Sequence, residues 1–90
     1  MDPVIHTKIG WHDLRWDPED LPEEGELILV TQETVDGVRR VSSNVYLKNL
    51  DDDSYCWCTR IWDPYTHQTE ETMLWETVVA WAYYPPPYIV

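Results

Sequence analysis

Two cysteines and three histidines of this 90-residue chain could support nucleophilic catalysis, namely Cys56, Cys58, His6, His12 and His67, and all of them except His6 could also form a zinc site. A cysteine beside a histidine can form a nucleophile–base pair, and the same residue types ligate structural zinc. However, C-x-C is an unusual zinc spacing, and the sequence has no phosphate loop, G-x-S-x-G, H-E-x-x-H or C-x-x-C motif. We therefore predict no catalytic residue, no metal site and no cofactor, and a protein that is not an enzyme.

The two cysteines are instead expected to be reduced, structural thiols. Residues two apart on a strand share a face, but their Cα atoms are then about 6.5–7 Å apart. This is at or beyond the usual limit for a disulfide. Together with an N-terminus that lacks a basic region followed by an apolar stretch, this predicts an intracellular protein.

The charge is strongly negative, with 17 acidic against 6 basic residues and a formal net charge of −11. Proteins that bind nucleic acid or anionic membranes without sequence preference need cationic groups to displace counterions. We therefore expect no direct contact with nucleic acid and none with a membrane. Such a charge also keeps a protein soluble without any partner, and both readings stay open.

The sharpest charge feature is Asp51-Asp52-Asp53. It lacks the glycine and the distal glutamate of an EF-hand loop. It is therefore a solvated turn, a weak cation site or an acidic tip that contacts a partner. Acidic segments of this kind can imitate nucleic-acid phosphates and occupy the basic groove of a protein that handles nucleic acids.

Aromatic residues are the second unusual feature: the chain has six Trp, six Tyr and no Phe. Seven of them exceed what one thin core can hide: Tyr55, Trp57, Trp62, Trp75, Trp81, Tyr83 and Tyr84. Exposed Trp and Tyr are favoured anchors of protein interfaces. They can also stack on a purine, with Arg39, Arg40 or Arg60 close by.

Four segments are predicted to be β-strands, from their β-branched and aromatic content or their alternation: Glu26–Thr34, Val38–Lys48, Tyr55–Trp62 and Val78–Tyr84. The first carries Leu27–Val30 without alternation, which predicts a strand covered on both faces. Asp36-Gly37 predicts a type I′ hairpin turn.

Alternation assigns the faces of the second and third strands. We expect Val41, Val45 and Leu47 to face the core, with Tyr46 beside them, while Arg39, Ser42 and Asn44 face outward. The third strand should place Tyr55, Trp57, Thr59 and Ile61 on one side and Cys56, Cys58, Arg60 and Trp62 on the other.

The remaining segments carry weaker signals. Val4, Ile5 and Ile9 suggest an edge strand within a loose N-terminus (1–10), and Asp17 could cap one helical turn. We expect a loop over Tyr65–Thr72, then a helical turn or strand start within Glu70–Glu76, and a proline-rich tail (85–90). The chain should thus be a single mainly β domain (1–90). Its one small antiparallel sheet is a meander of about four to five strands, curled or open-barrel-like, with at most a short helical turn.

Three motifs stand near the two ends of the chain: Trp11-His12-Asp13-Leu14-Arg15, then Asp17-Pro18-x-Asp20-Leu21-Pro22-x-x-Gly25-x-x-Ile28-Leu29-Val30, and Val79-Ala80-Trp81. Together they resemble a small domain of unknown function that is common in phages and prophages of Gram-positive and gut bacteria. The chain departs from that family's pattern in an apparent extra loop at 63–76 and in the prolines at 85–87. The resemblance implies a phage or prophage accessory protein with a small β-rich fold, in the cytoplasm of an infected or lysogenic bacterium. It implies no activity.

These motif residues also have physical roles. Leu21, Pro22 and Gly25 should deliver the chain into the first long strand, where glycine permits a turn that other residues resist. Trp11 and Trp81 are expected to form the two halves of an aromatic core.

We therefore expect a non-enzymatic, phage-type accessory protein that binds and inhibits a host protein with a basic surface, such as a nucleic-acid-handling or anti-phage defence factor. The predicted contact residues are Asp51, Asp52, Asp53, Tyr55 and Trp57. The alternative is an oligomeric sponge that sequesters a small nucleotide signal. A homo-oligomer formed through the sheet edges remains open.

Overall fold

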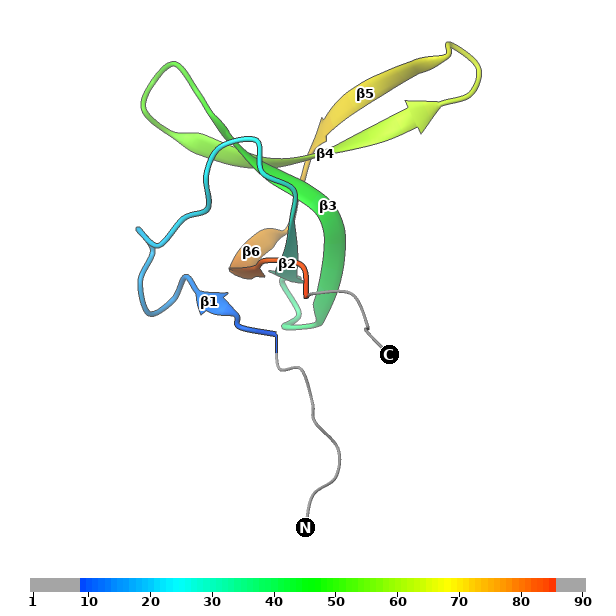
Figure 1. The fold of residues 1–90 in the computed structure, drawn as a ribbon. Coiled ribbons are helices and arrows are strands. Elements are labelled where there is room, and N and C mark those ends of the chain that lie inside the picture. Colours follow the sequence, from blue (N-terminus) through cyan, green and yellow to red (C-terminus); the bar gives the residue numbers. More distant parts are fainter. Residues whose placement is uncertain (1–8, 86–90) are drawn as a thin grey trace, which may run out of the picture.

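The computed structural model describes residues 9–85, which form one antiparallel sheet of six strands (Figure 1). The strands are β1 (His12–Asp13), β2 (Ile28–Glu33), β3 (Arg39–Asn49), β4 (Tyr55–Asp63), β5 (Gln68–Met73) and β6 (Thr77–Ala82). The predicted all-β class and the single antiparallel sheet are confirmed. The sheet is open, since β1 and β5 form its two edges. In the described part of the chain, no helix is long and apolar enough to cross a membrane.

The strand order is β1-β6-β2-β3-β4-β5, so only β2 to β5 form a meander. The sequence predicts a meander of about four to five strands, whereas the described sheet has six, and β6 lies between β1 and β2. The composition of the strands explains this order. Four of the six residues of β6 are buried, whereas β5 is polar and exposed along nearly its whole length. An apolar strand gains from two neighbours, while a polar strand tolerates the edge.

The predicted loop over Tyr65–Thr72 is wrong, because β5 pairs with β4 along all six of its residues. The expected extra loop at 63–76 is thus mainly a hairpin, which extends away from the other strands (Figure 1). Its turn ends at His67, whose φ is 55°. No helical turn forms at Met73–Trp75.

The hairpin between β2 and β3 forms at Asp36-Gly37 as predicted, but not as a type I′ turn. Gly37 has a φ of 82°, whereas Asp36 is not in the positive-φ region. The Thr34 N–H donates to the Val38 carbonyl (2.9 Å), and the Gly37 N–H donates to the Thr34 carbonyl (3.0 Å). This is a three-residue loop with glycine in the left-handed position, the second common way to join two antiparallel strands.

A β-bulge at Asn44 explains why the prediction for Val41 is wrong. Ile28 pairs with Val45 but Val30 pairs with Ser42, so β3 has one extra residue here, and Asn44 adopts a φ of 56°. An extra residue reverses the alternation of side chains. Ser42 therefore shares the face of Val45, and Val41 is 59% exposed instead of facing the core.

The central core cluster lies on one face of the sheet, here called the core face, and consists of Ile28, Val30, Val45 and Trp81. Tyr46 and Cys58 are buried on the opposite face. Leu14, Trp57, Leu74 and Val78 pack against this cluster. The expectation that Leu27–Val30 is covered on both faces is wrong, since burial alternates along β2 and Leu27 is 53% exposed. Only the core face of this strand is sealed.

Trp81 is the aromatic centre of the core, but Trp11 is not its partner. Trp81 is buried, and its ring stacks on His12 with centroids 4.0 Å apart and planes 9° apart. Trp11 is 37% exposed. The register between β1 and β6 places His12 opposite Trp81, so the second half of the aromatic core is an imidazole.

The segment before β2 is irregular but positioned. Pro22 is buried, and Gly25 has a φ of 83° with its N–H donating to the Leu47 carbonyl. This confirms the turn predicted at Gly25. Asp17 caps no helix: its carboxylate accepts from the Glu19 N–H in a local turn. The predicted N-terminal edge strand and the proline-rich tail fall mainly outside the described residues, and Ile9 is not in a strand.

Candidate protein-binding surface

The turn between β3 and β4 presents the three predicted aspartates. The Leu50 N–H donates to the Ser54 carbonyl (2.8 Å), and Asp53 closes the loop with a φ of 65°. The Asp52 carboxylate accepts from the hydroxyl and the N–H of Ser54, and these bonds lower its pKa. All three aspartates are exposed. Asp52 thus stabilises the turn, while Asp51 and Asp53 take part in no ion pair within the described chain.

Tyr55 and Trp57 follow directly at the start of β4. They pair with Asn49 and Leu47 of β3 and share the core face, as the alternation predicted. Their rings meet edge to face with centroids 6.0 Å apart. Trp57 is half-buried against the core cluster, while Tyr55 is 40% exposed. Trp57 therefore fixes the position of a more exposed neighbouring ring.

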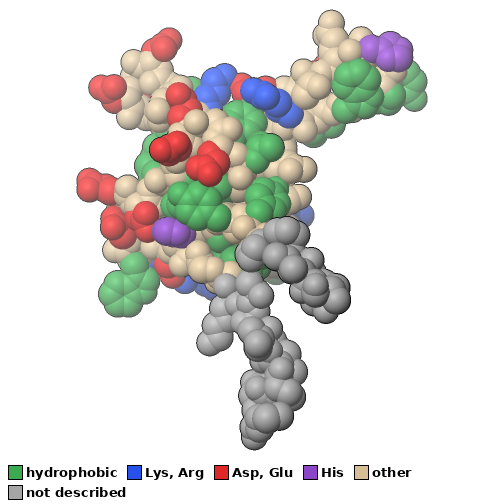
Figure 2. Space-filling view, viewed as in Figure 1, with side chains coloured by type: hydrophobic (Ala, Val, Ile, Leu, Met, Phe, Trp, Pro, Cys, Tyr) green, Lys and Arg blue, Asp and Glu red, His purple; other side chains and the backbone are tan. Residues whose placement is uncertain are grey.

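A second acidic segment reaches the same place, which the sequence reasoning missed. Glu24 forms a parallel bridge with Leu47, and its carboxylate accepts from the Asn49 N–H at 2.6 Å. Glu24 and Gly25 thus lie beside the end of β3. The only signal in the sequence was the turn at Gly25. Figure 2 shows acidic side chains gathered over this side of the molecule, with hydrophobic side chains between them. We call Glu24, Asp51, Asp52, Asp53, Tyr55 and Trp57 the acidic–aromatic surface.

The basic side chains of the described chain are all engaged elsewhere. Four are paired with carboxylates: Arg15 with Asp13, Arg39 with Glu33, Arg40 with Glu76 and Lys48 with Glu71. Hydrogen bonds from Arg15 lower the pKa of Asp13 to about 2. The fifth, Arg60, lies over the ring of Tyr46, 5.0 Å from its centroid. None of these cations neutralises the acidic–aromatic surface.

Of the residues considered for chemistry, His6 lies outside the described part of the chain, and the others are not gathered into one site. His12 lies against Trp81 and hydrogen-bonds to Asp20, while His67 is in the β4–β5 turn near Trp62. No group of three or more His, Cys, Asp or Glu side chains is placed to hold a metal within the described residues. Cys56 and Cys58 are free thiols with their sulfur atoms 3.5 Å apart.

These two thiols should differ in reactivity. Cys58 is buried, and burial together with the neighbouring Cys56 thiol raises its pKa to about 11. The thiolate is the reactive form, so iodoacetamide at pH 8 should modify Cys56 at least about tenfold faster than Cys58. Peptide mass spectrometry over time measures both rates. Equal rates in the native protein, with unfolded protein as the control, would contradict this placement.

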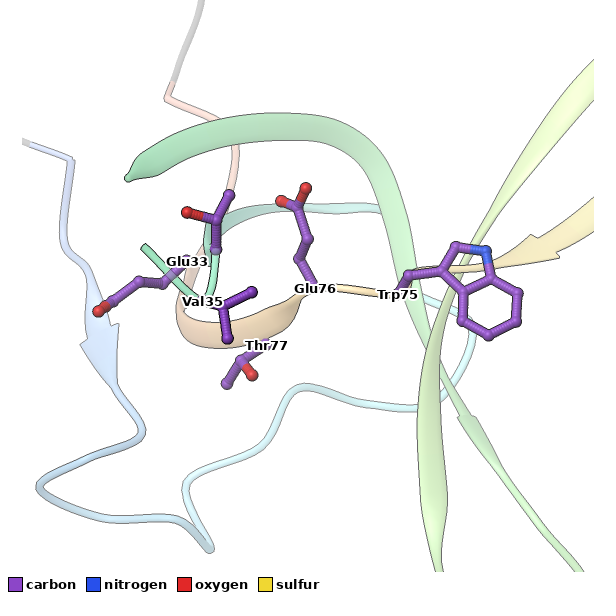
Figure 3. A pocket seen from close by; sticks show the side chains of 6 residues that line it. Glu33, Val35, Trp75, Glu76 and Thr77 are labelled. Atoms are coloured by element: carbon purple, nitrogen blue, oxygen red, sulfur yellow. The ribbon is translucent and has the colours of Figure 1, made fainter. Parts of the chain in front are cut away.

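Further aromatic side chains are exposed outside this surface. Trp75 is 88% exposed, in line with the excess of rings that the sequence indicated, and Trp16 and Tyr65 were missed. A hollow of about 340 Å³ lies at the start of β6, and Trp75 is among its lining residues. Figure 3 shows the Trp75 side chain pointing away from Glu33 and Val35. The carboxylates of this hollow, Glu33 and Glu76, are held by arginines.

Comparison with known proteins adds no relative: no family model, no curated protein and no solved structure matches this chain.

Proposed function

We propose that this protein is a non-enzymatic accessory protein that binds a host protein with a basic surface and inhibits it. The acidic–aromatic surface makes the contact, with Tyr55 and Trp57 as anchors and the aspartates as the charged part. The motif resemblance adds the setting, namely a phage or prophage protein acting in the bacterial cytoplasm on a nucleic-acid-handling or defence factor.

One observation supports this proposal above others: the carboxylates around an exposed tyrosine remain unneutralised while every described cation is engaged elsewhere. Complementary charge steers a partner and fixes the orientation of the complex. A large amphipathic ring supplies the contact area that charge alone does not. If the negative charge served only solubility, there would be no reason for the cations to be paired elsewhere or for an aromatic ring to be exposed among the acidic side chains.

The test is capture of partners from a bacterial lysate, followed by affinity measurements with a matched pair of variants. Asp51→Lys with Asp53→Asn changes the charge of the surface by three units and leaves Asp52 to hold the turn. We expect it to weaken binding at least about tenfold and to flatten its salt dependence.

The control variant is Glu19→Lys with Asp36→Asn, which alters the net charge equally at exposed positions outside the surface. It should change the affinity by less than about threefold. Equal losses in the two variants would show that only the net charge matters, and unchanged affinity in the first would remove this surface from consideration.

The nucleotide sponge remains an alternative that the described arginines do not favour. Arg39 and Arg40 are paired with Glu33 and Glu76, and Arg60 lies on Tyr46. A phosphate would have to displace these partners against a strongly acidic background. A thermal-shift screen with cyclic nucleotides tests it, because a ligand that binds the native state raises the melting temperature.

A further inference from the structure

Within residues 9–85, β5 is an edge strand, and no other described strand lies along its outer side. One contact shows which backbone groups of β5 point toward β4. The Leu74 N–H donates to the Trp57 carbonyl at 2.8 Å, and this pair continues the β4–β5 register. Hydrogen-bonded and non-hydrogen-bonded pairs alternate along an antiparallel ladder. Thr69, Glu71 and Met73 are therefore in non-hydrogen-bonded pairs with β4. Their N–H and C=O groups point to the open edge.

The two faces of β5 would offer different surroundings to an added strand. On the core face, Glu70 is exposed and forms no ion pair within the described residues. On the opposite face, Met73 is 46% and Trp62 is 56% exposed, while the Glu71 carboxylate already has partners. An added strand would thus meet an unpaired carboxylate on the core face, with Ile61 behind it on β4. On the opposite face it would meet Met73 and Trp62, beside a glutamate that is already paired.

A second copy of the chain is a poor occupant for this edge. Two copies could pair their β5 strands antiparallel about a two-fold axis. Because the backbone groups of Thr69, Glu71 and Met73 point outward, two registers would keep most of β5 paired. The first register places Glu71 directly opposite Glu71 of the second copy. The second register places the two Glu70 side chains opposite each other. Like charges directly opposite each other on paired strands are destabilising, and each copy carries a net charge of −11.

We propose that β5 receives an extended segment of a partner protein in which basic residues alternate with β-branched apolar residues. The segment adds a seventh strand to the sheet and hydrogen-bonds to the backbone of Thr69, Glu71 and Met73. Its basic side chains lie beside Glu70, and its apolar side chains lie against Met73 and Trp62. This contact is separate from the acidic–aromatic surface and does not depend on it.

The test uses an end-capped octapeptide of alternating lysine and valine, titrated into the full chain and followed by NMR. We expect the amides of Thr69, Glu71 and Met73 to shift and to gain protection from hydrogen exchange. The amides of Gln68, Glu70 and Thr72 should respond much less, because they already face β4. The same peptide with alternate backbone nitrogens methylated keeps every side chain but loses donors, and should bind at least about tenfold more weakly.

A matched pair of variants tests the same contact from the protein side. Thr69→Pro removes an outward-facing donor without touching the β4–β5 hydrogen bonds, and should weaken peptide binding at least about tenfold. Thr69→Ala should stay within about twofold. If circular dichroism shows that the proline variant does not fold, the comparison of the methylated and unmethylated peptides on the unaltered chain still tests the proposal.

Three results would overturn the proposal. They are equal binding of the methylated peptide, no response of the three amides at millimolar peptide, and a dimer of the free chain that Thr69→Pro abolishes, which would make a second copy the occupant. The Asp51→Lys, Asp53→Asn variant should keep its peptide response, so this test fails or succeeds separately from that of the acidic–aromatic surface.

Discussion

Replacing Trp81 with alanine should cost about 3–5 kcal/mol of folding free energy, which is a large part of the stability of a domain this small. Trp81 is 1% exposed at the centre of the core. Its ring stacks on His12 and meets Tyr83 edge to face at 5.1 Å. Its Nε1–H donates to the Asp20 carbonyl, so truncation removes packing, ring contacts and a hydrogen bond together.

Urea unfolding followed by circular dichroism measures this loss. Trp16→Ala is the matched control, because Trp16 is 88% exposed and its removal should change stability by less than about 0.5 kcal/mol. Trp81→Phe separates the contributions, since it keeps a ring but loses the donor. A loss below about 1 kcal/mol in Trp81→Ala would contradict the central role of this ring.

Deleting Asn44 should destabilise the protein by about 2–4 kcal/mol, because it removes the residue that sets the phase of β3. Without Asn44, either the side chains before residue 44 point to the opposite face of the sheet, or the pairing of β3 with β2 shifts by one residue. Ser42 would then leave the buried side chain of Gln32, to which its hydroxyl donates. The bonds between Asn44 and the Tyr84 hydroxyl would also be lost.

Asn44→Gly is the control for the deletion. It keeps a residue that tolerates a φ of 56° and loses only the side-chain contact with Tyr84, so we expect a change of about 1 kcal/mol or less. Chemical denaturation compares both variants with the parent chain. A deletion that is no worse than Asn44→Gly would show that the bulge does not determine the register.

The elements that could be predicted from sequence are those whose apolar pattern reflects local burial. β2, β3, β4 and β6 are rich in β-branched or aromatic residues, and the sequence predicts the bounds of all four to within about two residues. β5 gave no such signal, because its Glu70 and Glu71 bury no apolar face. Its backbone pairing with β4 makes it a strand, and this is a tertiary effect.

The face of a side chain was predictable only where the alternation was unbroken. Tyr55 and Trp57 share a face as the two-residue period requires, whereas Val41 lies beyond the bulge at Asn44 and was misplaced. The neighbourhood of the aspartate turn was predictable only in part. The bridge from Glu24 to Leu47 joins residues far apart in the sequence, as does the ion pair from Arg40 to Glu76. Periodicity carries no information about such contacts.

The two ends of the sheet are unequal, and this limits how the molecule can assemble. β1 comprises only two residues, whereas β5 offers six. Within the described residues, only the β5 edge is long enough to receive an added strand, so a segment that docks there forms a complex of fixed stoichiometry. Fibre formation needs two mutually compatible ends on every subunit. This architecture should therefore favour discrete one-to-one complexes over open-ended polymers.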